Sequence, residues 1–219
     1  MATSTQTRRE VRSGLVALAV TGPLFTLGII LRGAIDISDT TSLIREAPSP
    51  GFATGWTLIV FGFVLQLYGF FGLYRYLTTQ SESLIALWGF ALRTVGGALG
   101  VPVFLFLAIN GPEIARRQQR GDPDAIVVLE RFFTGGLGVA LLGFATTAAV
   151  VGFILFVIAM WRDGRLPRWT VVVFTLSLPL LAIAVTFVTE LLGGLLWLIS
   201  TAVIAWKGWQ ESAVPTPDQ

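Results

Sequence analysis

A single arginine lies in the middle of a long apolar segment. Arg93 is the only charged residue between Leu84 and Ile109, and a segment of that length can cross the hydrocarbon layer of a membrane. A guanidinium at that depth is costly unless it faces the interior of a helical bundle and finds polar partners there. Its planar fork of N–H donors suits carboxylate and carbonyl oxygens. The sequence therefore predicts an interior polar site at Arg93. The site is either a pocket for a small anionic or carbonyl-bearing ligand or a hydrogen-bond clamp between helices, and the clamp is favoured.

Other polar side chains are predicted at the depth of Arg93. At a rise of about 1.5 Å per residue, Arg93 and Gln66 lie roughly 13 Å and roughly 12 Å from the same predicted membrane boundary. Their two segments follow one another and run antiparallel, so Gln66 is the expected partner of Arg93. Three hydroxyl groups near that level complete the predicted site: Thr94, Thr175 and Ser177.

Glu190 is the only charged residue between Trp169 and Trp206. We expect it near the outer membrane boundary, where it would mark the turn between two segments and cap the last helix at its positive N-terminus. The alternative is a proton-titrating carboxylate paired with Arg93, which requires a helix tilt to close a depth mismatch of ~10 Å. The cap and turn marker is favoured.

The chain contains no cysteine and no histidine. It therefore has no thiolate, disulfide or imidazole group to serve as nucleophile, general base or ligand. We predict neither catalytic residues nor a metal or cofactor site, and an enzyme is not the favoured class. The net charge is only +2, and no basic segment is interleaved with aromatic residues, so binding to nucleic acid is not expected.

The elements that must position these residues are predicted from the distribution of apolar residues. Apolar residues make up 54% of the chain and charged residues 13%, about half the charge of a soluble domain. The prediction is an all-α, polytopic bundle in the cell membrane, with a polar tail at 1–13 and a disordered tail at 208–219. A short surface helix is expected near 39–46. Six spans are predicted: 14–31, 52–74, 84–109, 132–161, 169–188 and 190–206. A cleaved signal peptide is the alternative to the first span, and an uncleaved span is favoured.

Arginine and aromatic residues orient the predicted bundle. In the six-span topology, the side of the membrane that holds both termini carries more Lys and Arg than the other side, which predicts that both termini are cytoplasmic. A belt of aromatic residues is expected at that boundary: Tyr74, Tyr76, Trp88, Trp161, Trp169, Trp206 and Trp209. Gly96 and Gly100, with Gly69 and Gly72, are expected to pack helices closely. The role of the charged 110–131 loop stays open.

The order of short motifs resembles an uncharacterised family of bacterial six-helix membrane proteins, domain-of-unknown-function family 4386. The similar motifs are Leu73-Tyr74, Ala91-Leu92-Arg93, Leu166-Pro167-Arg168, Glu190 with Trp197-Leu198, and Lys207-Gly208. The resemblance extends over about residues 10 to 210, except the 110–131 loop. It implies a six-helix bundle in a membrane and no particular activity.

The leading functional hypothesis is a binding or accessory membrane protein with an interior polar site centred on Arg93 and Gln66. The alternative is a small-solute transporter or a channel protomer that forms a homo-oligomer. A lipid-modifying intramembrane enzyme is the least favoured class, because paired carboxylates at matched depth are missing. The expected partners are the lipid bilayer and a small anionic or carbonyl-bearing ligand.

Overall fold

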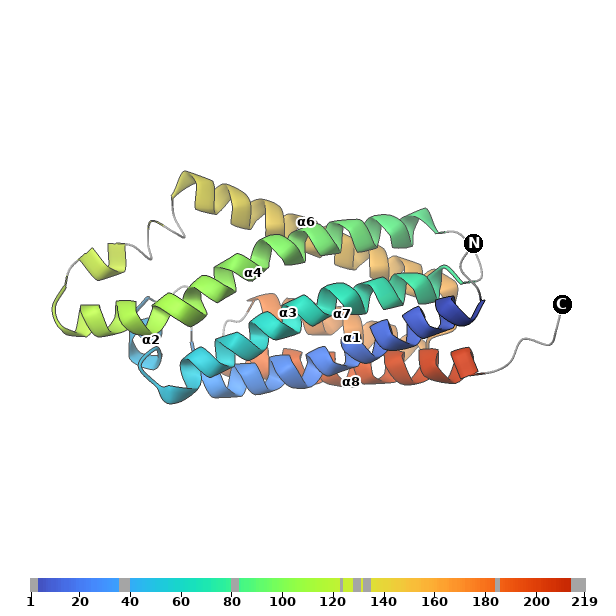
Figure 1. Ribbon diagram of the computed structural model, residues 1–219, viewed down its shortest axis with the longest axis horizontal. Coiled ribbons are helices and arrows are strands. Elements are labelled where there is room, and N and C mark those ends of the chain that lie inside the picture. The colour runs from blue at the N-terminus through green and yellow to red at the C-terminus, as the bar shows by residue number, and fades with distance from the viewer. Residues whose placement is uncertain are drawn as a thin grey trace.

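The computed structural model describes residues 4–35, 40–79, 83–122, 124–127, 131, 135–183 and 186–213, and these residues contain helices and no strand. The all-α prediction is therefore confirmed. The helices with defined bounds are α1 Ser4–Arg32, α2 Thr40–Glu46, α3 Pro50–Leu77, α4 Leu84–Gln119, α6 Gly136–Asp163, α7 Arg168–Ile183 and α8 Phe187–Ala213 (Figure 1). Helix α2 is the short helix predicted near 39–46.

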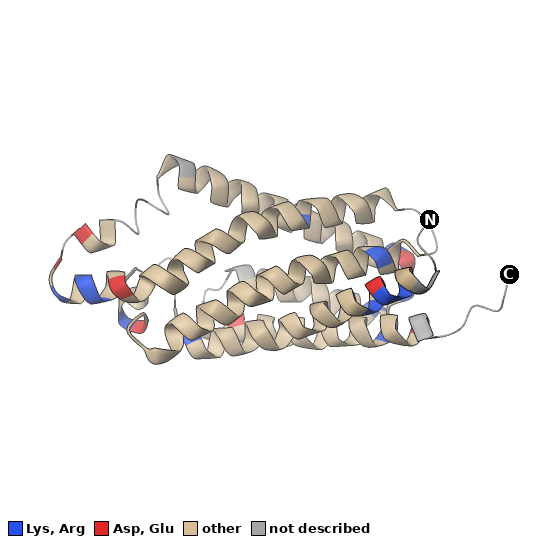
Figure 2. Ribbon diagram, viewed as in Figure 1, with Lys and Arg blue, Asp and Glu red and all other residues tan. Residues whose placement is uncertain are grey.

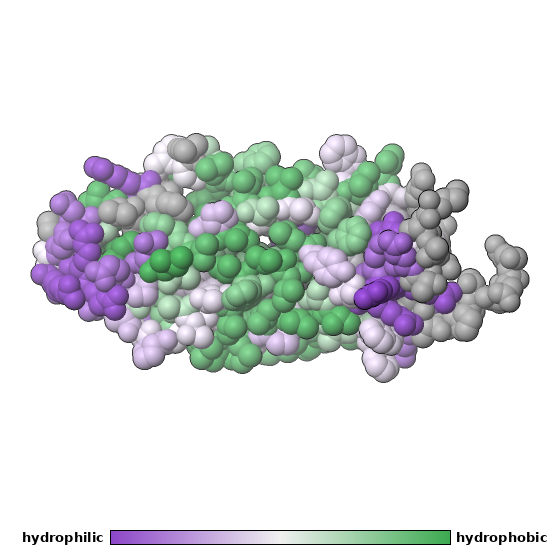
Figure 3. Space-filling model, viewed as in Figure 1, coloured by the Kyte–Doolittle hydropathy of each residue, from purple (hydrophilic) through white to green (hydrophobic). Residues whose placement is uncertain are grey.

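Five of these helices, α1, α3, α4, α6 and α8, are long and apolar enough to cross a membrane. Charged residues gather at the two ends of the bundle (Figure 2). The surface between those ends is predominantly hydrophobic (Figure 3). The lengths and the amino-acid composition of these five helices are thus those of membrane-spanning helices. Helix α7 has 16 residues, or roughly 24 Å, so the sixth span stays a prediction.

Several helices extend beyond the predicted spans, because polar residues continue them past the apolar segments. Helix α1 begins at Ser4, within the predicted polar tail, and α8 continues to Ala213, although disorder was expected from 208. Helix α4 extends through Asn110 to Gln119, and residues 124–127 are also helical, so much of the predicted charged loop is helical. Side-chain pairs such as Arg116 with Glu113, joined at 2.9 Å, support this extension. Helix α6 begins at Gly136, and residues 132–134 of the predicted fourth span lie outside the described residues.

The turn before α8 also differs from the prediction. Helix α7 ends at Ile183 and α8 begins at Phe187, so Glu190 lies in the first turn of α8 instead of opening it. The predicted role of Glu190 as a marker of this turn agrees with its place. Its side chain makes a different contact from either one predicted, described below.

Glycines set the closest helix contacts. A Cβ atom on Gly72 of α3 would lie 2.6 Å from the Cα atom of Gly14 on α1, and one on Gly69 would lie 2.8 Å from the Cα atom of Leu18. A Cβ atom on Gly96 of α4 would lie 2.5 Å from the backbone nitrogen of Ala149 on α6. These backbones can approach so closely only because the side chain is absent. Gly100 has no comparable neighbour, so its predicted packing role is wrong.

The aromatic belt is present in part. The five predicted tryptophans are exposed at the end of the bundle where α4 and α7 begin and α6 and α8 end: Trp88, Trp161, Trp169, Trp206 and Trp209. The N-terminal end of α1 reaches the same level, since the Cζ atom of Arg12 lies 4.9 Å from the ring centroid of Trp209. Tyr76 does not belong to the belt, because it is buried and bonded to Glu211.

Candidate binding cavity

Arg93 and Gln66 meet between α4 and α3. The Nη2 group of Arg93 donates a hydrogen bond to Oε1 of Gln66 over 2.7 Å. Both side chains are buried, and Arg93 is 5% exposed. The backbone of Arg93 lies directly against Gly152 of α6, where no larger residue would fit. Close packing against α6 therefore fixes this part of α4, and with it the direction of the guanidinium.

The charge of Arg93 has no acidic neighbour in the part of the chain that the structure describes. The ion pairs found there all involve other residues. The Nε group of Arg93 has no hydrogen-bond partner. On one side the guanidinium lies against an aromatic ring, with its Cζ atom 5.2 Å from the centroid of Phe70. A cation–π contact offsets part of the desolvation cost, but it leaves the positive charge unneutralised.

A cavity of about 300 Å³ lies beside this pair in the centre of the bundle. That volume is at the small end of the range for small-molecule sites, roughly 300–1,000 Å³. Arg93, Gln66, Thr146 and Glu190 are the polar members of its wall. The remaining wall is apolar, with these aromatic residues: Phe25, Trp56, Phe63, Phe104 and Trp197. The rings of Phe63 and Phe104 are stacked at 4.9 Å between centroids, and Phe104 also stacks on Trp56.

One residue of the cavity wall, Thr146 in the N-terminal half of α6, is exposed at the surface of the molecule. This helix packs mainly on α4 and makes few contacts with α7 or α3, and Figure 1 shows it diverging from the bundle toward its N-terminal end. Val139, Leu141 and Phe144 are exposed there. An opening beside Thr146 therefore lies on the apolar flank of the molecule, where lipid chains would surround it.

The three hydroxyl residues predicted with Arg93 do not join it. Thr175 and Ser177 donate to carbonyl groups of their own helix, those of Val171 at 2.7 Å and Phe174 at 2.6 Å. Thr94 follows Arg93 by one residue, which turns it about 100° around the helix. Its hydroxyl oxygen is buried without a partner, and it does not line the cavity. Depth along a helix is not sufficient to predict a contact, because the direction around the helix also decides it.

Glu190 forms an ion pair with Arg32 and not with Arg93. Oε2 of Glu190 on α8 contacts Nη2 of Arg32 at the end of α1. The Arg32 side chain is 0% exposed, and its guanidinium lies over the ring of Trp56, 4.8 Å from the centroid. The sequence carried a signal for this pair. Arg32 closes the first apolar segment, so it reaches the same outer boundary at which Glu190 was expected.

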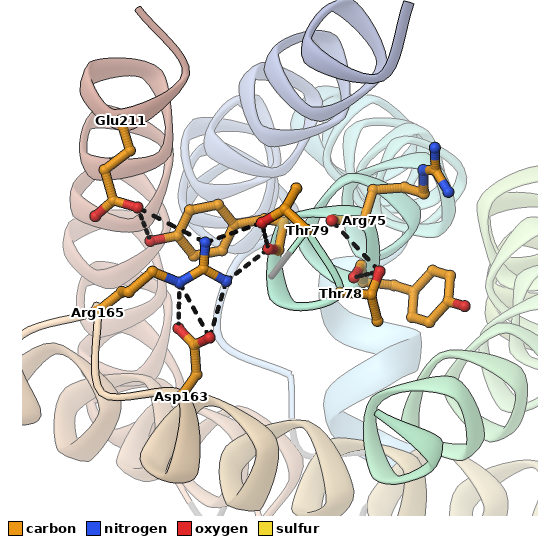
Figure 4. Close-up of polar contacts among 8 residues, drawn as sticks. Arg75, Thr78, Thr79, Asp163, Arg165 and Glu211 are labelled. Atoms are coloured by element: carbon orange, nitrogen blue, oxygen red, sulfur yellow. Dashed lines mark hydrogen bonds and ion pairs between the residues drawn. The ribbon is translucent and has the colours of Figure 1, made fainter. Parts of the chain in front are cut away.

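A second polar cluster, absent from the prediction, closes the opposite end of the bundle (Figure 4). Arg165 lies between Asp163 and Glu211, and its Nη1 and Nη2 groups donate to Oγ1 of Thr79 at 3.0 Å and to the carbonyl oxygen of Tyr76 at 2.7 Å. The hydroxyl group of Tyr76 donates to Glu211 over 2.8 Å. The cluster joins the ends of α3, α6 and α8.

Electrostatics within this cluster favour a permanent charge on Arg165. Burial by itself would lower the pKa of its guanidinium. The hydrogen bond to the Asp163 carboxylate and the electrostatic contributions of Tyr76, Asp163 and Glu211 together outweigh burial and leave the pKa raised above its ordinary value. The charge of Arg165, unlike that of Arg93, is therefore compensated by carboxylates of the protein, and the cluster has a structural role in holding these helix ends together.

Comparison of the chain with family models, with curated proteins and with solved structures found no match. The resemblance to domain-of-unknown-function family 4386 stays a prediction.

Proposed function

We propose that this chain is a binding or accessory protein of the cell membrane, and that its central cavity holds a small anionic or carbonyl-bearing ligand on Arg93 and Gln66. In this proposal α7 is the sixth span and both termini are cytoplasmic. The observation that carries it is a buried guanidinium that borders a largely apolar cavity and forms no ion pair with any described carboxylate, since Glu190 in the same wall is paired with Arg32. An anion there would neutralise the charge in a medium of low dielectric constant, where the attraction is strong.

The same observation favours a pocket over a clamp. A guanidinium that only held helices together would direct its donors at protein acceptors, as Arg165 does at the other end of the bundle. Arg93 uses Nη2 on the neutral amide of Gln66, and its Nε group has no partner. A carboxylate can accept two parallel hydrogen bonds from such a fork.

Thermal unfolding of the purified chain in detergent, with and without benzoate, tests this function. Benzoate is a small carboxylate whose ring suits the aromatic wall. At a concentration near 100 times its dissociation constant it should stabilise the protein by about 2.7 kcal/mol, a rise of roughly 5–10 °C in melting temperature for a chain of this size. Arg93→Gln should abolish the rise. Arg93→Lys should reduce it, because lysine keeps the charge and loses the fork.

Arg162→Gln is the matched control, since Arg162 is exposed and remote from the cavity lining. It should respond to benzoate as the wild type does. If Arg93→Leu lowers the melting temperature while wild type shows no benzoate response, the clamp is correct and the binding function is wrong.

A transporter is the second candidate, and the prolines favour it. Pro102 lies inside α4 and Pro179 inside α7, each next to a residue of the cavity wall, Val103 and Leu178. Prolines weaken helices at such positions, and broken helices near the midplane are common in transporters. A transporter predicts Arg93-dependent uptake of a carboxylate into reconstituted vesicles, whereas a binding protein predicts binding without uptake.

A further inference from the structure

We infer that the ligand of this cavity is a lipid-soluble carboxylic acid with a single hydrocarbon chain, which enters from the bilayer between α6 and α7. This inference deepens the proposed function and rests on it. It adds the chemical class of the ligand and its route, both of which follow from the shape and surroundings of the cavity.

The route follows from the position of the opening. Thr146 lines the cavity and is exposed on the flank of α6. Thr147 is also exposed there, but the large exposed side chains nearby, Val139, Leu141 and Phe144, are apolar. Helix α6 makes few contacts with α7 across the gap. On the face shown in Figure 3, a hydrophobic band separates the two polar ends of the molecule. In a membrane the flank faces acyl chains, so a molecule that enters there must first dissolve in lipid.

The acidic head follows from the depth of Arg93. The guanidinium is nine residues into α4, roughly 14 Å from its start and thus near the middle of a ~30 Å hydrocarbon layer. A phosphate or sulfate group would carry its charge to that depth at high cost. A carboxylic acid has an ordinary pKa near ~4.3 and can cross lipid in its protonated form. On binding it releases that proton to the aqueous phase, and the carboxylate accepts hydrogen bonds from the Arg93 fork.

The single chain follows from the volume and the wall. About 300 Å³ is too little for the two acyl chains and headgroup of a phospholipid. Apart from its few polar groups the wall is aromatic and aliphatic, and it includes Leu178 and Leu181 of α7. One chain can lie along the stacked rings of Phe63 and Phe104, with its far end extending through the gap into the bilayer.

The test uses the full chain in phosphatidylcholine nanodiscs and two probes, a nitroxide-labelled stearic acid and its methyl ester. Both are added at equal mole fraction and at alkaline pH, and the motionally restricted fraction is measured by electron paramagnetic resonance. The acid and the ester share one chain, so any difference reports the head group. The association constant of the acid should exceed that of the ester by about tenfold or more, as expected for charge-assisted hydrogen bonds.

Variants separate the parts of the inference. In Arg93→Gln the association constants of the acid and the ester should become equal. In Arg162→Gln the acid should still bind more tightly than the ester. Thr146→Trp should reduce the restricted fraction of the acid by narrowing the opening. Because residue 146 is exposed on the flank of α6, the melting temperature of the Thr146→Trp variant should match that of the wild type. If Thr146→Trp leaves the acid excess unchanged, the route is wrong.

Benzoate distinguishes failure of this inference from failure of the proposed function. If benzoate stabilises the wild type in an Arg93-dependent manner while stearic acid shows no excess over its ester, the lipid-soluble acid is refuted and the binding function stands. If neither the benzoate stabilisation nor the preference for stearic acid over its ester depends on Arg93, both the inference and the proposed function are refuted.

Discussion

The ion pair between Arg32 and Glu190 should be among the most sensitive points of the fold, and the two residues should not be equally sensitive. Arg32 has no exposed side-chain surface and Glu190 retains 11%. Removing one partner of a buried pair leaves an uncompensated charge and costs about 3–5 kcal/mol. Glu190→Gln leaves the buried guanidinium of Arg32 without its carboxylate partner, and a guanidinium keeps its proton under all ordinary conditions. Arg32→Met leaves the carboxyl group of Glu190 without its partner. That group can bind a proton and become neutral, so the loss in free energy of unfolding should be smaller.

The structure sets the size of the expected effect. For a chain of this length, each kcal/mol shifts the melting temperature by roughly 2–4 °C, so the loss of about 3–5 kcal/mol in Glu190→Gln should lower it by about 6–20 °C. The double variant Arg32→Met/Glu190→Gln should recover much of that loss, because no buried charge remains. Arg45→Gln is the control, since its pair with Glu46 is on the surface with 67% of the Arg45 side chain exposed, and exposed pairs contribute under about 1 kcal/mol.

Thermal unfolding of these four variants in detergent is the assay. A Glu190→Gln melting temperature equal to that of Arg45→Gln would refute the reasoning. So would a double variant whose loss equals the sum of the two single losses, because that result would mean the two groups do not interact in the folded protein.

Three further predictions concern other parts of the fold. Gly72→Leu should lower the melting temperature strongly in the same assay, because its Cβ atom would lie 2.6 Å from Gly14; Gly143→Leu, with open space around it, should have little effect. Tyr76→Phe removes the hydrogen bond to Glu211 at 2.8 Å and should cost about 1 kcal/mol, whereas Tyr74→Phe should be neutral. The hydrogen bond from Arg117 holds the pKa of Asp122 below its ordinary value. That carboxylate therefore stabilises the end of α4 above its ordinary pKa and stops doing so as the pH falls through the lowered value. The protection of the amides of residues 116–121, measured as the observed hydrogen-exchange rate relative to the intrinsic rate at each pH, should fall on acidification, and Asp122→Asn should remove that fall.

The contact between Arg93 and Gln66 was predictable because three simple constraints apply to it. A lone charge in an apolar segment must face the interior, consecutive spans are antiparallel, and the rise per residue gives the depth. The same constraints were insufficient for Thr175 and Ser177, whose hydroxyl groups found carbonyl acceptors one turn away on their own helix. Short polar side chains can form hydrogen bonds with backbone carbonyl groups of their own helix instead of with a neighbouring helix. The depth of a residue in the membrane does not predict which of these acceptors it uses.

The partners of Arg32 and Arg165 were missed for a different reason. Both residues lie at the ends of apolar segments, where the sequence pattern indicates only a membrane boundary. Their contacts depend on which helix ends lie together, α1 with α8 in one case and α3 with α6 and α8 in the other. The cavity was not predictable from the chain either. It exists because α6 packs on α4 at Gly96 and Gly152 and leaves the rest of the bundle toward its N-terminal end.

A distance between the ligand and the guanidinium is the most direct measurement of the central claim. The chain, labelled with ¹⁵N in its arginine side chains, is reconstituted with a fatty acid labelled with ¹³C at the carboxyl carbon, and solid-state NMR measures the dipolar coupling. The account predicts a ¹³C–¹⁵N contact at ion-pair distance in the wild type that disappears in Arg93→Gln and persists in Arg162→Gln. No coupling in the wild type, or the same coupling in Arg93→Gln, would contradict it.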